Sequence, residues 1–429
     1  MEKKKYFQKR RNKVCELLDT NSIFFLSARE PVLKGDDEFF NFADVDFFYL
    51  TGIDEPFTKL ILYKDEKGIY SEFLFIEGTS EFDEIWNGKK LDLDEAKEIA
   101  GVENVDYIRN YEKVLDDLIE KNKVAKMYFL SERVSQETQF LYQRLVDKLR
   151  RKFKLEKEDL REKFSSLREI KDEIEIDNLR KAQEITNQGF RKVLSQIKNV
   201  SNEKEIEALF TYVFTKNFSS HSYSPIVASG ENACVLHYSK NSKEINENDL
   251  ILLDVGAEFN NYKADITRTY PKLGKFSDRQ RKVYESCLKV QEEAIKLIST
   301  SKTKIEWEKE VHLEMAKELV ELGLLTETDV DEIKEKWNNS EGFKKLKKYF
   351  PHSTGHFLGL DTHDCGDYKG YLKSGQVITV EPGIYIREEN IGVRIEDDIL
   401  IKEEGVENLS KEVLKCPKQI EEEMSKINL

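Results

Sequence analysis

The sequence predicts a protein of two α/β domains (α+β in overall class), the second built around an antiparallel sheet. Three observations predict this class. The chain has 429 residues, a length typical of about two or three domains. Its first ~160 residues alternate strand-like and helical patterns. The remainder combines amphipathic helices with two acidic segments, each of which predicts a hairpin of buried strands.

Composition favours a soluble protein that binds neither nucleic acid nor membrane. The net charge of −14 opposes binding to a phosphate backbone. No run of ~18 apolar residues is present, and no apolar stretch after the basic start suggests a signal peptide. The five cysteines lack CxxC spacing, which disfavours a disulfide framework or a thiolate zinc site. We therefore expect a cytoplasmic protein.

The amino-terminal domain is predicted to comprise residues 1–165, which contain no histidine. Its strand-like runs are SIFFLS, DFFYL, KLILY, EFLFI and KMYFL, and its helical patterns are YEKVLDDLIEKN and VSQETQFLYQRLVDKLRRKF. The charged stretch RRKFKLEKEDLREKFSSLREIKDE lacks glycine and proline, which predicts a helical connector. The second domain is predicted to comprise residues 166–429.

Two helices are predicted in the second domain. In EIDNLRKAQEITNQGFRKVLSQI, apolar residues recur at intervals of three and four, as on one face of a helix. The segment WEKEVHLEMAKELVELGLL is also helical in pattern. It contains His312, which lies outside any motif and is interpreted as a structural or surface residue.

The first acidic segment is DLILLDVGAEFNNYKADITRTYP, residues 249–271. The asparagine pair at 260–261 can adopt the positive φ angles of a tight hairpin turn. Folding about this pair places Asp254 opposite Thr267, with Asp265 two positions along on the same face. Diagonal neighbours of this kind have Cα atoms ~7–8 Å apart, so both carboxylates could reach one ion.

The second acidic segment is QVITVEPGIYIREENIGVRIEDDILI, residues 376–401. Folding it about residues 388–389 places Glu381 opposite Glu396, with Arg394 on the same face. The proline after Glu381 cannot donate to a strand ladder and should distort the pairing.

These acids are expected to be buried, although a single acid is most often a solvated surface group. In LILLD and VITVE the acid ends a run that is apolar on both faces, as in a buried strand. Four converging carboxylates would repel one another by several kcal/mol at an effective dielectric of ~20 unless cations neutralised them. Two divalent ions would balance the charge.

Three of the six histidines, His352, His356 and His363, lie in the segment FPHSTGHFLGLDTHD. The first two have the spacing of helical zinc sites. However, the intervening residues disfavour a helix, and the glutamate expected after the first histidine is missing. We expect a strand or loop that carries one metal ligand, with the other two histidines beside the site.

Five segments in order resemble the signature segments of the aminopeptidase P and prolidase family: GENACVLHYSKN, LLDVGAEFNNYKADITRTYP, FPHSTGHFLGLDTHD, TVEPGIYI and GVRIEDDI. The resemblance is close over residues ~170–420, and DFFYLTGIDEP upstream resembles the family's amino-terminal domain. It implies a creatinase/prolidase-like amino-terminal domain followed by a catalytic domain with the pita-bread fold.

The resemblance implies a dinuclear metal centre whose ligands are Asp254, Asp265, His356, Glu381 and Glu396. Asp265 and Glu396 would bridge the two ions, which are usually manganese in this family. An oxygen-rich ligand set with one imidazole agrees with Mn²⁺. Two such ions can bind and deprotonate a water molecule.

The resemblance also implies roles around the metals. His237 and His363 match histidines near the scissile bond, and Glu381 is the candidate general base. Three residues match the lining of the proline pocket: His352, Tyr385 and Arg394. His221 matches no family histidine and stays unassigned.

The implied activity is hydrolysis of the Xaa–Pro bond at the amino terminus of peptides that carry proline at the second position. The Xaa–Pro amide has no N–H, so a protease that anchors this group loses a contact. Prolidase, which cuts only Xaa–Pro dipeptides, is the nearest alternative and shares every quoted segment. The alternative of a different class is a non-catalytic peptide-binding module of the same fold, which the complete ligand set opposes.

Family members commonly form dimers or tetramers, so a homodimer or homotetramer is expected. Trp86, in EIWNGKK, resembles a family segment at a subunit contact. An ordinary core tryptophan is the alternative interpretation.

Overall fold

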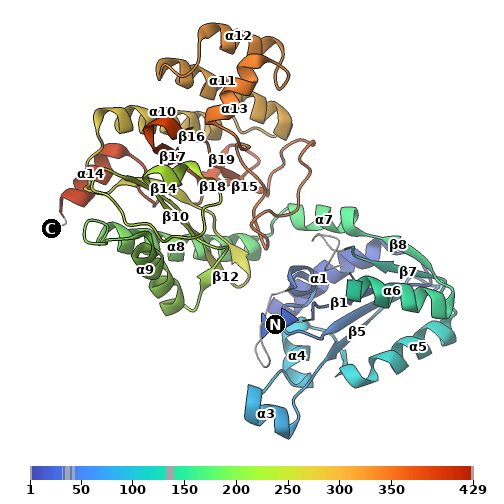
Figure 1. Cartoon of the computed structure of the whole chain (residues 1–429). Helices are drawn as coiled ribbons and strands as arrows, with labels where there is room; N and C mark the ends of the chain where they lie inside the picture. Colours follow the sequence, from blue (N-terminus) through green and yellow to red (C-terminus); the bar gives the residue numbers. More distant parts are fainter. Residues whose placement is uncertain (1, 31, 34–38, 41–43, 132–139, 427–429) are drawn as a thin grey trace. The chain divides into compact units, whose positions relative to one another are not determined.

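The computed structural model of the chain describes residues 2–30, 32–33, 39–40, 44–131 and 140–426. The chain divides into two compact units, residues 1–167 and residues 168–429 (Figure 1). Each unit has its own sheets and its own buried apolar cluster.

The amino-terminal unit is built on a six-stranded mixed sheet of strand order β6-β5-β4-β1-β7-β8. Its strands are β1 (Ser22–Ser27), β4 (Lys59–Lys64), β5 (Tyr70–Ile76), β6 (Asn104–Tyr107), β7 (Lys126–Phe129) and β8 (Glu156–Asp159), with β2 (Val32–Leu33) and β3 (Phe39–Phe40) paired apart from it. Its helices are α1 (Glu2–Glu16), α2 (Val45–Thr51), α3 (Glu81–Asn87), α4 (Leu93–Ala100), α5 (Tyr111–Asn122), α6 (Phe140–Phe153) and α7 (Arg161–Glu169). Side chains of α5 and α6 share one apolar cluster with those of β1 and β4.

Most predicted elements of this unit are confirmed. SIFFLS, KLILY, EFLFI and KMYFL lie in strands, and YEKVLDDLIEKN is helix α5. The predicted helix 134–153 is confirmed from residue 140 onward, and its first six residues lie outside the described part of the chain. Two predictions were wrong, and both errors have a physical cause.

The segment DFFYL belongs to helix α2 and is not a strand. The Asp44 side chain accepts a hydrogen bond from the Phe47 amide, which caps the first turn, and Gly52 ends the helix at φ 71°. The connector is only partly helical, because residues 156–159 form strand β8, which pairs in parallel with β7. In both cases a short local pattern was ambiguous, and caps or a distant strand decided the outcome.

The second unit, residues 168–429, combines helices with short antiparallel strands. Its helices are α8 (Glu173–Leu194), α9 (Glu203–Lys216), α10 (Asp278–Lys296), α11 (Lys304–Glu321), α12 (Glu327–Glu335), α13 (Glu341–Tyr349) and α14 (Pro417–Ser425). The strands form sheets of order β10-β11-β14, β13-β12-β9, β15-β18-β19 and β16-β17. Their bounds are β9 (Ser220–His221), β10 (Ile226–Ser229), β11 (Leu250–Asp254), β12 (Ala257–Phe259), β13 (Tyr262–Lys263), β14 (Thr267–Pro271), β15 (Val377–Val380), β16 (Gly383–Ile386), β17 (Ile391–Arg394), β18 (Asp397–Ile401) and β19 (Val406–Asn408).

The first predicted hairpin is confirmed in its register. Asn260 and Asn261 have φ angles of 49° and 65°, and Asp254 pairs with Thr267. The ladder is interrupted, however, because β12 and β13 belong to a different sheet from β11 and β14. The hairpin therefore changes sheet just before Asp265.

The second hairpin also has the predicted register, since Val380 pairs with Asp397 and Gly383 pairs with Arg394. Its two ladders are separated at Glu381 and at Glu396. The interruption agrees with the expected effect of the proline after Glu381, which has no N–H to donate.

Helix α8 carries the predicted apolar face into the main core. Its buried residues include Leu179, Ala182, Phe190 and Val193, and a capping box at Asp172 fixes its first turn. Among the described residues, no helix is long and apolar enough to cross a membrane. All five cysteines are free, as the spacing predicted.

We expect Phe190→Ala to lower the free energy of unfolding by about 3–5 kcal/mol, because it empties a buried site. The Phe190 ring packs edge-on against Phe210, with centroids 5.1 Å apart. Phe218→Ala is the matched control, since Phe218 is 98% exposed, and its effect should stay within about 0.5 kcal/mol. Urea unfolding followed by circular dichroism measures both variants, and equal losses would contradict the core assignment.

Candidate metal centre and substrate pocket

Four acidic residues lie where paired strands leave one sheet and enter another. Asp254 ends β11, and Asp265 lies between β13 and β14. Glu381 lies between β15 and β16, and Glu396 lies between β17 and β18. Each carboxylate therefore comes from a break in a ladder, where the backbone turns side chains of two hairpins toward one point.

His356 reaches the same point from the loop that precedes β15. Its amide donates to the Thr379 hydroxyl at 3.0 Å, and its carbonyl accepts from the Thr379 amide at 2.8 Å. Gly355, which directly precedes His356, lies so close to strand β15 that an added Cβ would come within 1.9 Å of the Thr379 carbonyl oxygen. The absence of a side chain at Gly355 thus lets the loop pack directly against the strand.

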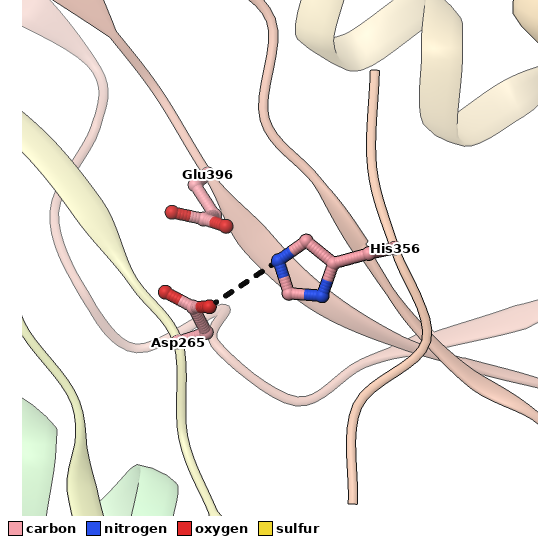
Figure 2. A group of neighbouring side chains, drawn as sticks. All are labelled: Asp265, His356 and Glu396. Atoms are coloured by element: carbon pink, nitrogen blue, oxygen red, sulfur yellow. Dashed lines mark ion pairs between the residues drawn. The ribbon is translucent and has the colours of Figure 1, made fainter. Parts of the chain in front are cut away.

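The structure brings the five sequence-predicted ligand residues together. Asp265, His356 and Glu396 offer ligand atoms that all lie within 4.8 Å of one another (Figure 2). The His356 Nε2 atom is 3.5 Å from Asp265 Oδ2 and 3.7 Å from Glu381 Oε1. Asp254 joins through the Tyr223 hydroxyl, which lies 2.5 Å from its carboxylate and 2.6 Å from that of Asp265.

Burial and mutual repulsion make three of these acids, Asp254, Glu381 and Glu396, hard to ionise. Burial raises the pKa of Glu396 well above its usual range, and the charges of Asp265, Glu381 and Asp254 add to this. Burial also raises the pKa of Glu381 to about 7. It raises the pKa of Asp254 as well, although the Arg394 guanidinium opposes the shift.

The pKa of the His356 imidazole is raised as well, but for a histidine this favours the charged form. Burial alone would lower its pKa, but the contacts with Asp265 and Glu381 raise it to about 9. The cluster thus attracts positive charge. Clustered carboxylates with one imidazole are a donor set that suits a hard or borderline divalent cation, so the residues present fit a metal.

Beside the cluster, two buried side chains and one half-buried side chain form a hydrogen-bonded chain. Arg394 Nη1 donates to the Tyr385 hydroxyl at 2.9 Å, and this hydroxyl lies 2.8 Å from His352 Nε2. Because the arginine can only donate, the tyrosine proton is free to bond Nε2, while Nδ1 faces the Ser353 carbonyl at 2.8 Å. Burial, helped by the charge of Arg394, lowers the pKa of His352 to about 3. His352, Tyr385 and Arg394 therefore form a wall beside the cluster, in which a neutral imidazole is hydrogen-bonded through the tyrosine to a charged guanidinium.

The two remaining predicted histidines lie on the solvent side. The His363 ring is exposed and lies 4.1 Å from the His356 ring, centroid to centroid. Partial burial lowers the pKa of His363, as do the charges of His356 and His237. His237 is exposed on the loop after β10.

Several residues that support the cluster were not predicted. Tyr223 links two carboxylates, the Thr267 hydroxyl donates to Glu396 at 2.6 Å, and the Asp398 carboxylate accepts from the Asp265 amide at 2.9 Å. Asp398 lies in the signature segment GVRIEDDI, whereas Tyr223 lies in none of the five signature segments. Their pairing with the carboxylates depends on contacts across the fold, for which the sequence carries no local signal.

The loop between His352 and His356 is held by charges from two helices. Both carboxylate oxygens of Glu308 accept from the Thr354 amide, at 2.9 and 3.0 Å. Lys347 donates to the His352 carbonyl at 2.9 Å and lies equally far from His312 Nε2. His312 is buried, so the expectation of a structural residue holds and that of a surface residue does not.

Two further expectations concern residues outside this cluster. Trp86 is 73% exposed, so the core interpretation was wrong. Its side chain shares the exposed apolar surface of α3 with Phe82 and Ile85. His221 lies 2.8 Å from the Thr211 hydroxyl and takes no part in the cluster.

The family of the chain follows from comparison with known proteins. Residues 177–403 match metallopeptidase family M24, and residues 7–128 match the N-terminal domain of aminopeptidase P. The chain therefore belongs to metallopeptidase family M24, a family of metal-dependent peptidases. The resemblance stated from the sequence is confirmed.

The similarity to individual proteins extends over the whole chain. It is 35% identical over 435 aligned positions to the Xaa-Pro aminopeptidase of Haemophilus influenzae, covering 97% of this chain and 96% of that protein. It is 33% identical to the Xaa-Pro aminopeptidase of Escherichia coli, with the same coverage. A solved structure of a variant of Escherichia coli aminopeptidase P in complex with substrate has a TM-score of 0.89 at 32% identity, covering 99% of this chain and 98% of that one. The predicted fold class is thereby confirmed.

We expect divalent metal to stabilise the folded catalytic unit through this cluster. A ligand at 100 times its Kd adds about 2.7 kcal/mol, so Mn²⁺ should raise the melting temperature of the wild-type protein. Glu396→Gln should remove most of that rise, whereas Glu404→Gln, which changes an exposed acid, should keep it. Differential scanning calorimetry with and without Mn²⁺ measures this, and an undiminished shift in Glu396→Gln would place the metal elsewhere.

Proposed function

We propose that this chain is an Xaa-Pro aminopeptidase, which hydrolyses the bond between the amino-terminal residue of a peptide and a following proline. The observation that carries the proposal is the juxtaposition of the acid and imidazole cluster with the wall formed by His352, Tyr385 and Arg394. Its full-length relatives that bear this name support it.

Two divalent ions, most simply Mn²⁺, are proposed as the cofactor. Their ligands would be Asp254, Asp265, His356, Glu381 and Glu396, with Asp265 and Glu396 shared between the ions. When bound, the pair would supply an activated water and polarise the scissile carbonyl. The chain's own contribution is to hold four carboxylates together where Arg394 compensates only part of their charge, so that a bound cation can compensate the rest.

Proton transfer is assigned to residues at the open edge of the cluster. Glu381 is the proposed general base, which accepts a proton from the attacking water and returns it to the proline nitrogen as the bond breaks. Its Oε2 atom lies 3.8 Å from His352 Nδ1, so the carboxylate borders both the cluster and the pocket wall. His363 and His237, on the solvent side, would donate hydrogen bonds to the carbonyl oxygen as negative charge develops there.

The wall beside the cluster is the proposed proline pocket. An uncharged imidazole can face an apolar ring without losing the hydration of an ion, and the low pKa of His352 keeps it uncharged. The Phe350 ring packs against His352 with centroids 4.9 Å apart. Arg394 also donates to Asp254 at 2.6 Å, so the pocket and the cluster are built from one rigid network.

Prolidase activity is the second candidate function, because a dipeptidase of this family would use the same cluster and wall. A non-catalytic peptide-binding module of the same fold is opposed by the intact set of acids. A homodimer or homotetramer is proposed for assembly, with the exposed α3 surface of Phe82, Ile85 and Trp86 as its support. The cytoplasmic location stays a prediction.

The three clustered histidines should differ in what their loss affects. His356→Ala should lower metal content, because it removes a ligand. His363→Ala should keep its metal and lose turnover on the order of 10²-fold, if it assists proton transfer or the oxyanion. His352→Ala should act mainly on KM. Metal analysis with steady-state kinetics on an Xaa-Pro-Xaa peptide separates them, and normal metal and turnover in all three would overturn the assignments.

Substrate length separates the two candidate activities. An aminopeptidase must leave room beyond proline, whereas a dipeptidase must recognise the carboxylate of proline itself. We expect kcat/KM to be higher for Xaa-Pro-Xaa and longer peptides than for Xaa-Pro dipeptides in Mn²⁺ buffer. Exclusive cleavage of the dipeptide would make the chain a prolidase, and equal cleavage of an Xaa-Ala control would remove the proline pocket.

A further inference from the structure

The loop that carries His237 is fastened to helix α9 by one buried carboxylate. Glu203, the first residue of α9, is 0% exposed and is not part of the proposed metal or substrate site. Helix α9 lies beside β10, and the segment that follows β10 runs through the 3-10 turn Gly230–Cys234 before it reaches His237. The glutamate faces this segment.

Five donors from the loop converge on the Glu203 carboxylate. Oε1 accepts from the Ser229 amide at 2.8 Å, the Ser229 hydroxyl at 2.9 Å and the Asn232 side chain at 3.1 Å. Oε2 accepts from the Tyr238 hydroxyl at 2.7 Å and the Lys243 amide at 2.9 Å. The donors precede and follow His237 in the sequence, so the carboxylate joins the two ends of the loop that carries the histidine.

Further contacts tie the end of this loop to the same helix. The Glu203 amide donates to the Lys243 carbonyl at 3.0 Å, and the Asn241 side chain donates to Glu207 at 2.7 Å. His237 itself is exposed, so burial of its ring does not fix its position. Its position depends on neighbours such as Tyr238, whose hydroxyl donates a hydrogen bond to Glu203.

The chemistry of the contacts requires a carboxylate at this position. All five partners donate, and an ionised carboxylate only accepts, on both of its oxygens. A glutamine would present an NH₂ group to two or three of the donors and leave them unpaired in a buried place, which costs about 1–3 kcal/mol per group. Helix capping alone does not explain the burial, because Glu205 shares the first turn and is exposed.

We propose that Glu203 is a positioning residue for His237, through the loop of residues 229–243. The inference rests on the proposed function, in which His237 acts near the scissile bond. Glu203 contributes no atom to the reaction. It holds the loop so that the His237 imidazole stays on the side of the cluster where His363 lies. Loss of the Glu203 carboxylate therefore lowers kcat only by displacing His237.

A double-mutant cycle tests this dependence. Glu203→Gln should lower kcat for an Xaa-Pro-Xaa peptide about 10-fold with unchanged metal content, because small displacements of a catalytic group are costly. In the His237→Ala background the same substitution should cost less than about 2-fold, since the group it positions is already gone. Losses that multiply in the double variant would overturn the proposal.

Two further variants keep the test independent of folding defects. Tyr238→Phe removes one donor hydroxyl at nearly constant shape and should show the same dependence on His237, which carries the cycle if Glu203→Gln does not fold. Glu205→Gln makes the same change of charge in the same helical turn. It should leave kcat as in the wild type, and a loss equal to that of Glu203→Gln would overturn the proposal.

Hydrogen–deuterium exchange separates a failure of this inference from a failure of the proposed function. The amides of residues 235–243 should exchange faster in Tyr238→Phe and Glu203→Gln than in Glu205→Gln, whether or not the protein cleaves the peptide. Equal exchange would overturn the positioning role. Absence of Xaa-Pro cleavage by the wild-type protein would instead overturn the proposed function, and the exchange result would then decide the role of Glu203 in the loop.

Discussion

The constraint on which the catalytic unit depends is the repulsion among carboxylates that its strands bury together. Asp254, Asp265, Glu381 and Glu396 come from two hairpins, and burial raises the pKa of three of them. Such a group is costly to ionise without compensation, and Arg394 provides only part of it. The chain passes from one sheet to another at each acid, so these interruptions of the strand ladders bring the four carboxylates together. A divalent cation is then the natural partner of the fold.

Residues outside the strands are held by buried charges that project from helices. Glu203 of α9 fixes the His237 loop, and Glu308 of α11 accepts from the Thr354 amide two residues before His356. Arg168 donates to Asp364, next to His363, at 2.7 Å. Loops lack the ladder bonds that fix a strand, so charge-assisted hydrogen bonds from rigid helices replace them. A charged side chain from a helix thus holds the loop around each of His237, His356 and His363.

The difference between local strand pairing and contacts from distant helices explains what the sequence could predict. The registers of both hairpins followed from the turn residues and the pairing they imply, because a hairpin is a local structure. The burial expected from the apolar runs is only partial for Asp254 and Glu381, whereas Asp265 and Glu396, which end no such run, are buried. Helix α2 was missed because DFFYL is too short for its period to distinguish helix from strand. Tyr223 and Glu203 could not be found, since their partners lie far along the chain and no local pattern specifies them.

The cluster of histidines shows how one residue type serves several roles in a segment of twelve positions. His352 is half-buried and is hydrogen-bonded through Tyr385 to Arg394, and burial, helped by the arginine charge, lowers its pKa to about 3. His356 is buried, but two carboxylates raise its pKa to about 9, which marks the place where the fold attracts positive charge. His363 is exposed and faces solvent. Because the loop turns each ring toward a different environment, the chemical state of each imidazole is set by its neighbours, as the three roles proposed for them, in a pocket wall, as a metal ligand and as a hydrogen-bond donor, require.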